Sequence, residues 1–160
     1  MSTPLTPELQ DLLTLQLVPG LGPRLTAALL DRFGSAGAVL QASPDELCEV
    51  PHIGNKLAQD LHQAMRRADV TAEQELLARH GVGLLALGSP DYPAAVATIP
   101  DPPPLLYVRG TLQARDGNAV ALVGSRHCTS YGRRTAERLA AALVHKGYSV
   151  VSGLPLVTSL

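Results

Sequence analysis

The chain has 160 residues, of which 46% are hydrophobic and 17% are charged, and its formal net charge is −1. This composition predicts one or two ordered domains and excludes an intrinsically disordered chain. No apolar run reaches the roughly 18 residues that a membrane span needs, and the N-terminus lacks the basic region of a signal peptide. The two cysteines, Cys48 and Cys128, have no pairing or metal-ligand spacing. We therefore expect a reduced, cytoplasmic protein without a metal site.

Charge is distributed unevenly along the chain. Residues 1–116 hold eight Lys and Arg against thirteen Asp and Glu, whereas residues 117–160 hold five basic residues against one acidic residue. A polyanionic partner is therefore expected to bind the C-terminal part.

Residues 1–70 predict short helices separated by tight turns. Thr6 is a good N-cap before Pro7, and apolar residues follow at helical spacing, which predicts the first helix. Further helices are expected to begin near Pro23, Ser43, Asn55 and Thr71. Gly81 ends the last of them.

After residue 81 the pattern changes from helices to strands. We expect buried strands at 82–87, 105–110 and 119–123, a helix over about 133–146, and a last strand at 148–153. The order strand, helix, strand at the end predicts a right-handed βαβ unit of a parallel sheet.

A five-residue pattern occurs twice, as Val-Pro-Gly-Leu-Gly at 18–22 and as Val-Pro-His-Ile-Gly at 50–54. Each copy precedes an amphipathic helix, which is the helix-hairpin-helix pattern. Its glycines let a phosphate approach the free N–H groups at the start of that helix. His52 replaces the first glycine of the second copy. The candidate DNA-backbone contacts are Gly20, Gly22, Arg24, Gly54 and Lys56.

A second interpretation is that the two hairpins only pack against each other as a small helical domain. Residues 1–69 hold five basic and eight acidic residues, whereas phosphate binding depends on a high density of cations. The sequence leaves both interpretations open, and it predicts the helical fold in either case.

The loop after the strand at 119–123 has the composition of a phosphate site. It lies at the carboxyl end of a buried strand that ends at Val123, where open α/β sheets bind ligands. Ser130 is the expected N-cap of a helix with a basic start. A phosphate there would meet backbone N–H groups, a hydroxyl, a guanidinium and a helix dipole. The residues concerned are Gly124, Ser125, Arg126, Arg133 and Arg134. The alternative is a tight turn with solvated arginines.

The same loop does not fit an ordinary nucleotide site. It lacks the Gly-x-Gly-x-x-Gly spacing of dinucleotide sites and the lysine of a P-loop. His127 and Cys128 are adjacent, so we expect their side chains to diverge and not to form a nucleophile–base pair. No cofactor and no catalytic residue are expected.

Several short motifs carry a family resemblance. Asp-Tyr-Pro and Pro-Pro-x-Leu-Tyr-x-x-Gly lie in 89–110, and Val-Gly-Ser-Arg, Tyr-Gly and Val-Ser-Gly lie in 121–153. In this order they resemble the DNA-processing protein A family (DprA/Smf). The resemblance implies an α+β fold with a SAM-like helix-hairpin-helix domain at 1–70, a connecting helix at 71–81, and an incomplete Rossmann-like DNA-binding domain at 82–160.

The resemblance also implies a function in natural transformation and recombination. The protein would bind single-stranded DNA, protect it and help to load the RecA recombinase, without enzymatic turnover and without a membrane partner. The implied DNA contacts are Gly124, Ser125, Arg126, Tyr131, Gly132, Ser152 and Gly153, in addition to the basic Arg133 and Arg134. The sequence after Leu154 departs from the family pattern, which predicts a truncated or frame-shifted product without the family's homodimer and RecA surfaces.

Two alternatives to single-stranded DNA binding stay open. The first is a Rossmann-like enzyme that hydrolyses a nucleoside monophosphate, although the chain lacks the Gly-Gly-x-Gly-Thr loop and the acidic catalytic residue that this chemistry needs. The second is a binder of the duplex backbone that acts through the two hairpins at 18–22 and 50–54.

Overall fold

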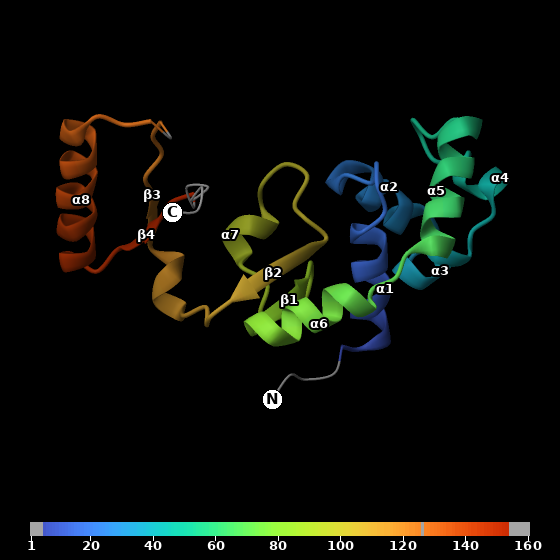
Figure 1. Ribbon diagram of the computed structural model, residues 1–160, viewed down its shortest axis with the longest axis horizontal. Coiled ribbons are helices and arrows are strands. Elements are labelled where there is room, and N and C mark those ends of the chain that lie inside the picture. Colours follow the sequence, from blue (N-terminus) through green and yellow to red (C-terminus); the bar gives the residue numbers. More distant parts are fainter. Residues whose placement is uncertain (1–4, 126, 154–160) are drawn as a thin grey trace. The chain divides into compact units, whose positions relative to one another are not determined.

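The structure is a computed structural model that describes residues 5–125 and 127–153. Its helices and strands form an α+β fold (Figure 1). Contacts within the chain divide it into two compact units, Met1–Gly110 and Thr111–Leu160. Over the described part of the chain, no helix is both long enough and apolar enough to cross a membrane.

The first unit begins with six helices, of which all but the one at Ala36–Gln41 are predicted by the sequence, and a side chain caps three of them. The Thr6 side chain accepts a hydrogen bond from the Leu9 N–H (3.3 Å) at the start of α1. Ser43 and Glu46 form a reciprocal capping box at the start of α4. The helices are α1 (Pro7–Gln16), α2 (Pro23–Phe33), α3 (Ala36–Gln41), α4 (Pro44–Leu47), α5 (Asn55–Arg67) and α6 (Thr71–His80).

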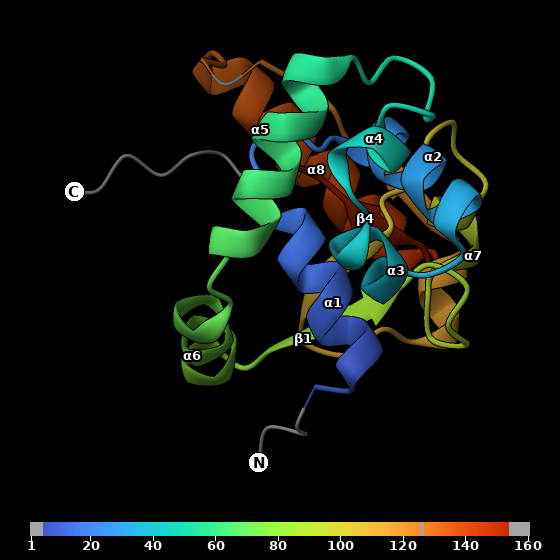
Figure 2. The same ribbon diagram turned by 90° about the vertical axis from the view of Figure 1, so that its right-hand side faces the viewer.

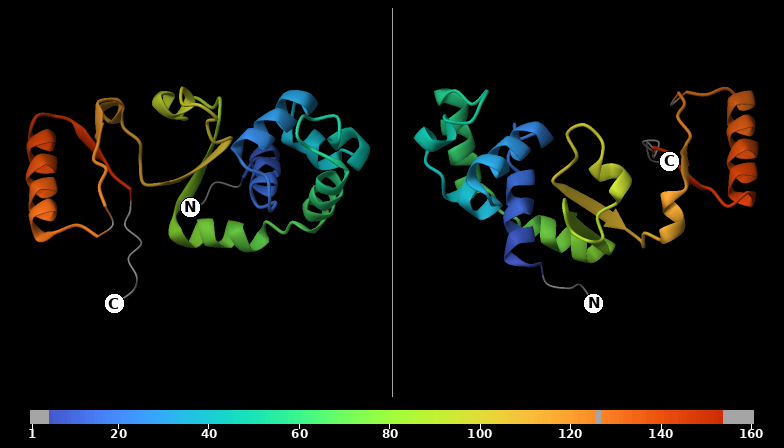
Figure 3. Two further views of the ribbon diagram at one scale, coloured as in Figure 1. Left: turned by 90° about the horizontal axis from the view of Figure 1, so that it is seen from above. Right: turned by 180° about the vertical axis from the view of Figure 1, so that it is seen from behind.

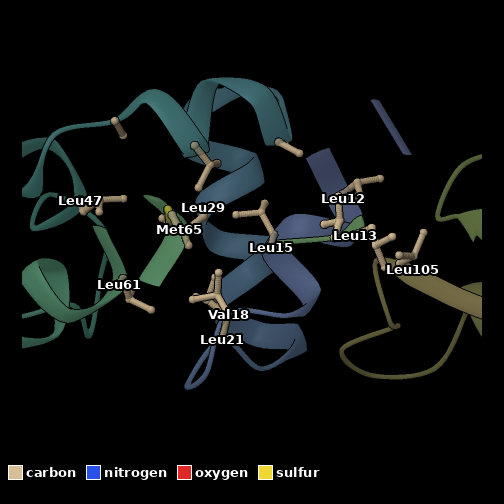
Figure 4. Packing of buried hydrophobic residues seen from close by; sticks show 14 of the residues in the cluster. Leu12, Leu13, Leu15, Val18, Leu21, Leu29, Leu47, Leu61, Met65 and Leu105 are labelled. Carbon is tan, nitrogen blue, oxygen red and sulfur yellow. The ribbon is translucent and has the colours of Figure 1, made fainter. Parts of the chain in front are cut away.

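The core of this unit surrounds α1. Leu13 and Leu15 are both 0% exposed, so α1 is buried on more than one side. Leu13 lies toward Leu105 of the later strand pair, whereas Leu15 lies toward Leu29 and Met65 (Figure 4). An apolar stripe at helical spacing describes one face of a helix, whereas α1 is covered on several faces.

The first two strands pair with each other. β1 (Val82–Ala86) and β2 (Leu105–Arg109) are antiparallel, with Leu84 opposite Tyr107. α1 contacts both strands, and α6 contacts β1. The segment that connects β1 to β2 carries the short helix α7 (Ala94–Ala97). The first compact unit therefore extends to residue 110, and the predicted division of the chain after residues 70 and 81 stays a prediction.

The expectation that both of these strands are buried holds for only part of each. Leu84 in β1 and Leu105 in β2 are the buried residues among the strand positions that the structure describes. Side chains alternate between the two faces of a strand. Leu84 is paired with Tyr107, and Leu105 lies two residues before Tyr107 in β2, so all three share the face that packs on the helices. Tyr107 is nevertheless 40% exposed, and Leu85, Leu106 and Val108 on the other face are half-buried.

The second unit contains the predicted strand–helix–strand arrangement. A 3₁₀ turn, η1 (Ala114–Gly117), precedes β3 (Ala119–Ala121), α8 (Ser130–His145) and β4 (Ser149–Val151). The two strands are parallel, with Ala121 opposite Val151. Figures 1 and 3 show α8 running beside this strand pair, and α8 contacts β4.

Three details of this unit differ from the sequence prediction. β3 ends at Ala121, and Val123 is 94% exposed. The N-cap of α8 is Thr129 and not Ser130, which is its first residue. None of the residues described in 111–153 is buried. The physical reason is that β3 has one partner strand and three residues, so only a short stretch of it is paired and covered.

Candidate nucleic-acid interface

The parallel pairing of β3 and β4 brings two predicted segments to the same edge of the sheet. Gly124 and Ser125 follow β3, and Ser152 and Gly153 follow β4. The Leu122 N–H donates to the Val151 carbonyl oxygen (2.8 Å), so the ladder continues up to these segments. The carboxyl ends of parallel strands therefore meet where the sequence predicts a phosphate. Arg126 lies outside the described residues.

Both glycines at this edge leave open space. A Cβ added to Gly124 or Gly153 would have no atom within 4 Å, and neither residue has a positive φ. The protein's own packing therefore does not require glycine at these positions. The small residues keep the backbone accessible to a ligand.

The N-terminus of α8 borders this edge along the chain. The Thr129 Oγ1 accepts a hydrogen bond from the Gly132 N–H (3.1 Å), and the Ser125 Oγ accepts one from the His127 N–H (3.2 Å). These bonds order the loop locally. The Ser125 hydroxyl keeps its own proton for donation to an anion.

The start of α8 is exposed and basic. Tyr131 is 73% exposed, and Arg133, Arg134 and Arg138 are exposed as well. Residues four apart in a helix share a face, so Arg134 and Arg138 present two cations side by side. Glu137 is the one acidic residue of α8. The start of α8 therefore presents positive charge and an exposed aromatic ring to the solvent.

The nearest carboxylate in the sequence, Asp116, does not lie at this edge. Its Oδ1 accepts a hydrogen bond from the Ser149 Oγ (2.8 Å), and its Oδ2 accepts one from the Gln113 N–H (2.8 Å). Ser149 begins β4, so Asp116 joins η1 to the end of β4 opposite the loop. In the described ranges, no group of three His, Cys, Asp or Glu residues is arranged to hold a metal ion.

In the first hairpin, the turn has the geometry that its glycines predict. Gly20 has a φ of 89°, and the Leu21 N–H donates to the Val18 carbonyl oxygen (3.2 Å). Gly22 is the N-cap of α2, with φ −89° and ψ 172°, and no side chain caps the helix.

The second hairpin has nearly the same backbone, although its sequence is less typical. His52 has a φ of 70°, which is the left-handed conformation of the glycine that it replaces. The Ile53 N–H donates to the Val50 carbonyl oxygen (3.1 Å). The N-cap of α5 is Gly54, with φ −90° and ψ 169°, again without a side-chain cap. Although His52 replaces a glycine, the structure gives two equivalent turns.

The cations of the two hairpins have different surroundings. The Arg24 Nε lies 3.6 Å from the Asp101 Oδ2. Lys56 has no ion pair within the part of the chain that the structure describes. Position N1 of α2 is Pro23, which has no N–H, whereas position N1 of α5 is Asn55. Nothing in the sequence pattern of either hairpin indicated the contact with Asp101.

Two separate segments of the chain match known families. Residues 10–67 match the SAM-like helix-hairpin-helix tandem family, which covers both hairpins. Residues 83–156 match the family described as DNA recombination-mediator protein A, which covers both strand pairs and the candidate interface.

Individual relatives agree with these matches. The chain is 32% identical to the protein Smf of Synechocystis sp. over 86% of its length and 35% of that protein. It is 34% identical to the DNA processing protein DprA of Bacillus subtilis over 46% of its length and 25% of that protein. It is also similar to UvrABC system protein C of Chromohalobacter salexigens, with 48% identity over 32% of this chain and 9% of that protein. The chain thus spans about a third or less of these relatives. With both segments matched in order, the chain is similar to the DNA-processing protein A (DprA/Smf) family.

Proposed function

We propose that this chain binds single-stranded DNA, without catalysis, as part of DNA processing in recombination and natural transformation. In this function it would protect incoming single-stranded DNA and help to load the RecA recombinase onto it. The observation that carries the proposal is the shared sheet edge, where Gly124–Ser125 and Ser152–Gly153 lie at the ends of adjacent parallel strands. The basic start of α8 follows this edge in the sequence.

Charge and chemistry support a phosphate ligand at this edge. The loop offers backbone N–H groups and the Ser125 hydroxyl, and α8 adds the exposed guanidinium groups of Arg133 and Arg134. Tyr131 offers an exposed ring on which a base can stack. Arg126, next to Ser125 in the sequence, is the proposed principal cation.

The test is fluorescence anisotropy of a labelled oligo-dT strand with the full chain. Arg126→Ala should weaken binding by about tenfold or more, because a hydrogen bond to a charged group contributes about 1.5–3 kcal/mol. It should also reduce the slope of log affinity against log salt by about 0.7, as expected when one phosphate contact with a single strand is lost. Arg79→Ala, an exposed change in α6, is the matched control and should leave affinity unchanged. Equal affinity of wild type and Arg126→Ala would contradict the site assignment.

An enzyme acting on nucleotides is less well supported at this edge. Release of the base from a nucleoside monophosphate breaks the bond between base and ribose and needs an acidic catalytic residue in the pocket, whereas Asp116 is engaged with Ser149 at the other end of β4. Release of free base from a nucleoside monophosphate by the purified protein would favour the enzyme.

The hairpins support a second candidate function, which is binding to the backbone of duplex DNA. The specific observation is that Gly20 and His52 share one backbone conformation, and that both following helices begin without a side-chain cap. Lys56→Ala should weaken binding of the full chain to a blunt duplex by a few-fold. Arg67→Ala, at the last residue of α5, is the control because it lies far from the start of that helix. Equal weakening by both variants would indicate a general charge effect and not a hairpin contact.

A further inference from the structure

An acidic residue is held against the cation of the first hairpin. The Arg24 Nε lies 3.6 Å from the Asp101 Oδ2, and the two side chains are 81% and 54% exposed. Arg24 is the second residue of α2, two residues after the Gly22 N-cap. The carboxylate therefore lies beside the guanidinium that is the first hairpin's candidate phosphate contact.

Two hydrogen bonds fix the loop that carries Asp101, and each joins a residue before α7 to a proline shortly after Asp101. The Tyr92 hydroxyl donates to the Pro103 carbonyl oxygen (2.8 Å), and Tyr92 is 7% exposed. The Leu87 N–H donates to the Pro104 carbonyl oxygen (2.9 Å). Figures 1 and 2 both show the yellow loop after α7 beside α2.

Asp101 itself has a φ of 52°, in the left-handed region. Asp and Asn tolerate this conformation better than most residues. The loop therefore presents this carboxylate in a defined backbone conformation, and an Asn at this position would retain it. Because the side chains are exposed, the ion pair is weak and can exchange partners.

We propose that Asp101 competes with DNA phosphate for Arg24, and that the second hairpin is therefore the stronger contact with duplex DNA. This inference rests on the second candidate function, the binding of duplex backbone by the hairpins. A phosphate that approaches α2 meets the negative charge of Asp101 and a guanidinium already paired with it. A phosphate that approaches α5 meets Lys56, which has no ion pair among the described residues.

The structure therefore ranks the second hairpin above the first as a contact for duplex DNA, whereas the sequence pattern alone favours the first. By sequence, the first hairpin has both glycines and an arginine, and the second has His52 in place of a glycine. By structure, the two turns are equivalent, and the difference lies in the charge next to each cation. A change at Asp101 should therefore act on the first hairpin alone.

The test is anisotropy of a labelled blunt duplex with the full chain at low salt, comparing wild type with Asp101→Asn. The substitution should raise duplex affinity by about two- to fivefold, the range expected for an exposed ion pair, and the gain should shrink as salt rises. Glu75→Gln is the matched control, because it removes the same charge from an exposed position of α6. The affinity for oligo-dT should not change with Asp101→Asn.

A double-mutant cycle distinguishes competition for Arg24 from a general change in the protein's electrostatic attraction for DNA. In the Arg24→Ala background, Asp101→Asn should have a much smaller effect on duplex affinity. An equal gain in both backgrounds, or an equal gain from Glu75→Gln, would overturn the proposal. If Lys56→Ala weakens duplex binding while Asp101→Asn changes nothing, the hairpin function stands and the role of Asp101 is refuted. If neither wild type nor Asp101→Asn binds duplex, both fail.

Discussion

Replacing His52 by glycine should stabilise the first unit. His52 has a φ of 70° and an exposed side chain, so its conformation costs energy without burial to compensate. At the equivalent position of the first hairpin, Gly20 has a φ of 89° and pays no such cost. The two positions form a natural comparison within one chain.

The size of the effect follows from two opposing terms. The left-handed conformation costs a residue with a Cβ about 1–2 kcal/mol of free energy, and histidine is among the residues that tolerate this conformation better. Glycine lowers the free energy of unfolding by about 0.5–1 kcal/mol, because it gives the unfolded chain more conformational freedom. The net gain for His52→Gly is therefore about 0.5 kcal/mol, which corresponds to a rise in Tm of about 2–4 °C for a unit of this size.

Urea unfolding followed by circular dichroism measures this change in the free energy of unfolding. The reverse exchange, Gly20→Ala, is the control and should lower stability by about 1 kcal/mol. A loss of stability in His52→Gly, together with a neutral Gly20→Ala, would refute the reasoning, because it would mean that neither turn holds a left-handed residue.

Three further changes test other parts of the structure. Leu13→Ala should lower the free energy of unfolding by about 3–5 kcal/mol in urea titrations, because Leu13 is 0% exposed at the centre of the core. Ser43→Ala should cost about 1 kcal/mol. Backbone and side-chain hydrogen bonds with Ser43 hold the pKa of Glu46 below its usual 4.5. Their stabilising effect is therefore present above pH 4.5 and is lost as pH falls through the lowered value, and NMR titration of the variant should show the pKa of Glu46 rising. Burial, and then Glu73, raise the pKa of Tyr107 to about 12. Glu73→Gln should lower it in tyrosinate absorbance, and wild-type stability should fall above about pH 10, where tyrosine ionises first in the unfolded chain.

Local signals predicted most of the first unit. Thr6 and Ser43 cap helices as expected, and the helix over Thr71–His80 ends at Gly81, which has a φ of 61°. These features depend on a few neighbouring residues, which a sequence displays directly. The helix Ala36–Gln41 was missed, because six residues are too few for a helical period to appear.

Strand length in the second unit was less predictable. The apolar run at 119–123 suggests a strand to Val123, but β3 ends at Ala121 and Leu122 makes the last hydrogen bond to β4 that the structure shows, because the extent of a ladder is set by its partner strand. The N-cap of α8 was displaced by one residue because Thr129 and Ser130 are adjacent hydroxyl residues that both suit that position.

At the candidate interfaces, the sequence predicted the positions but not the surroundings. Gly124, Ser125, Ser152 and Gly153 fall at one sheet edge because a βαβ unit requires it. The contact of Arg24 with Asp101 joins residues far apart in the sequence, and no local pattern announces such a contact. The left-handed backbone conformation of His52 was likewise not predicted, and it becomes clear only when the two turns are compared in the structure.

The separation of core and candidate DNA site affects how mutational results are read. The buried residues described by the structure all lie at or before Leu105, whereas the residues described in 111–153 are half-buried or exposed. Replacing an exposed residue such as Arg133 therefore opens no cavity, and large losses of stability come chiefly from buried groups. A variant of the sheet edge that loses DNA affinity while keeping the wild-type Tm has lost a contact with the ligand. The same reasoning applies to Asp101, which is exposed, so a gain in duplex affinity there reports charge and not folding.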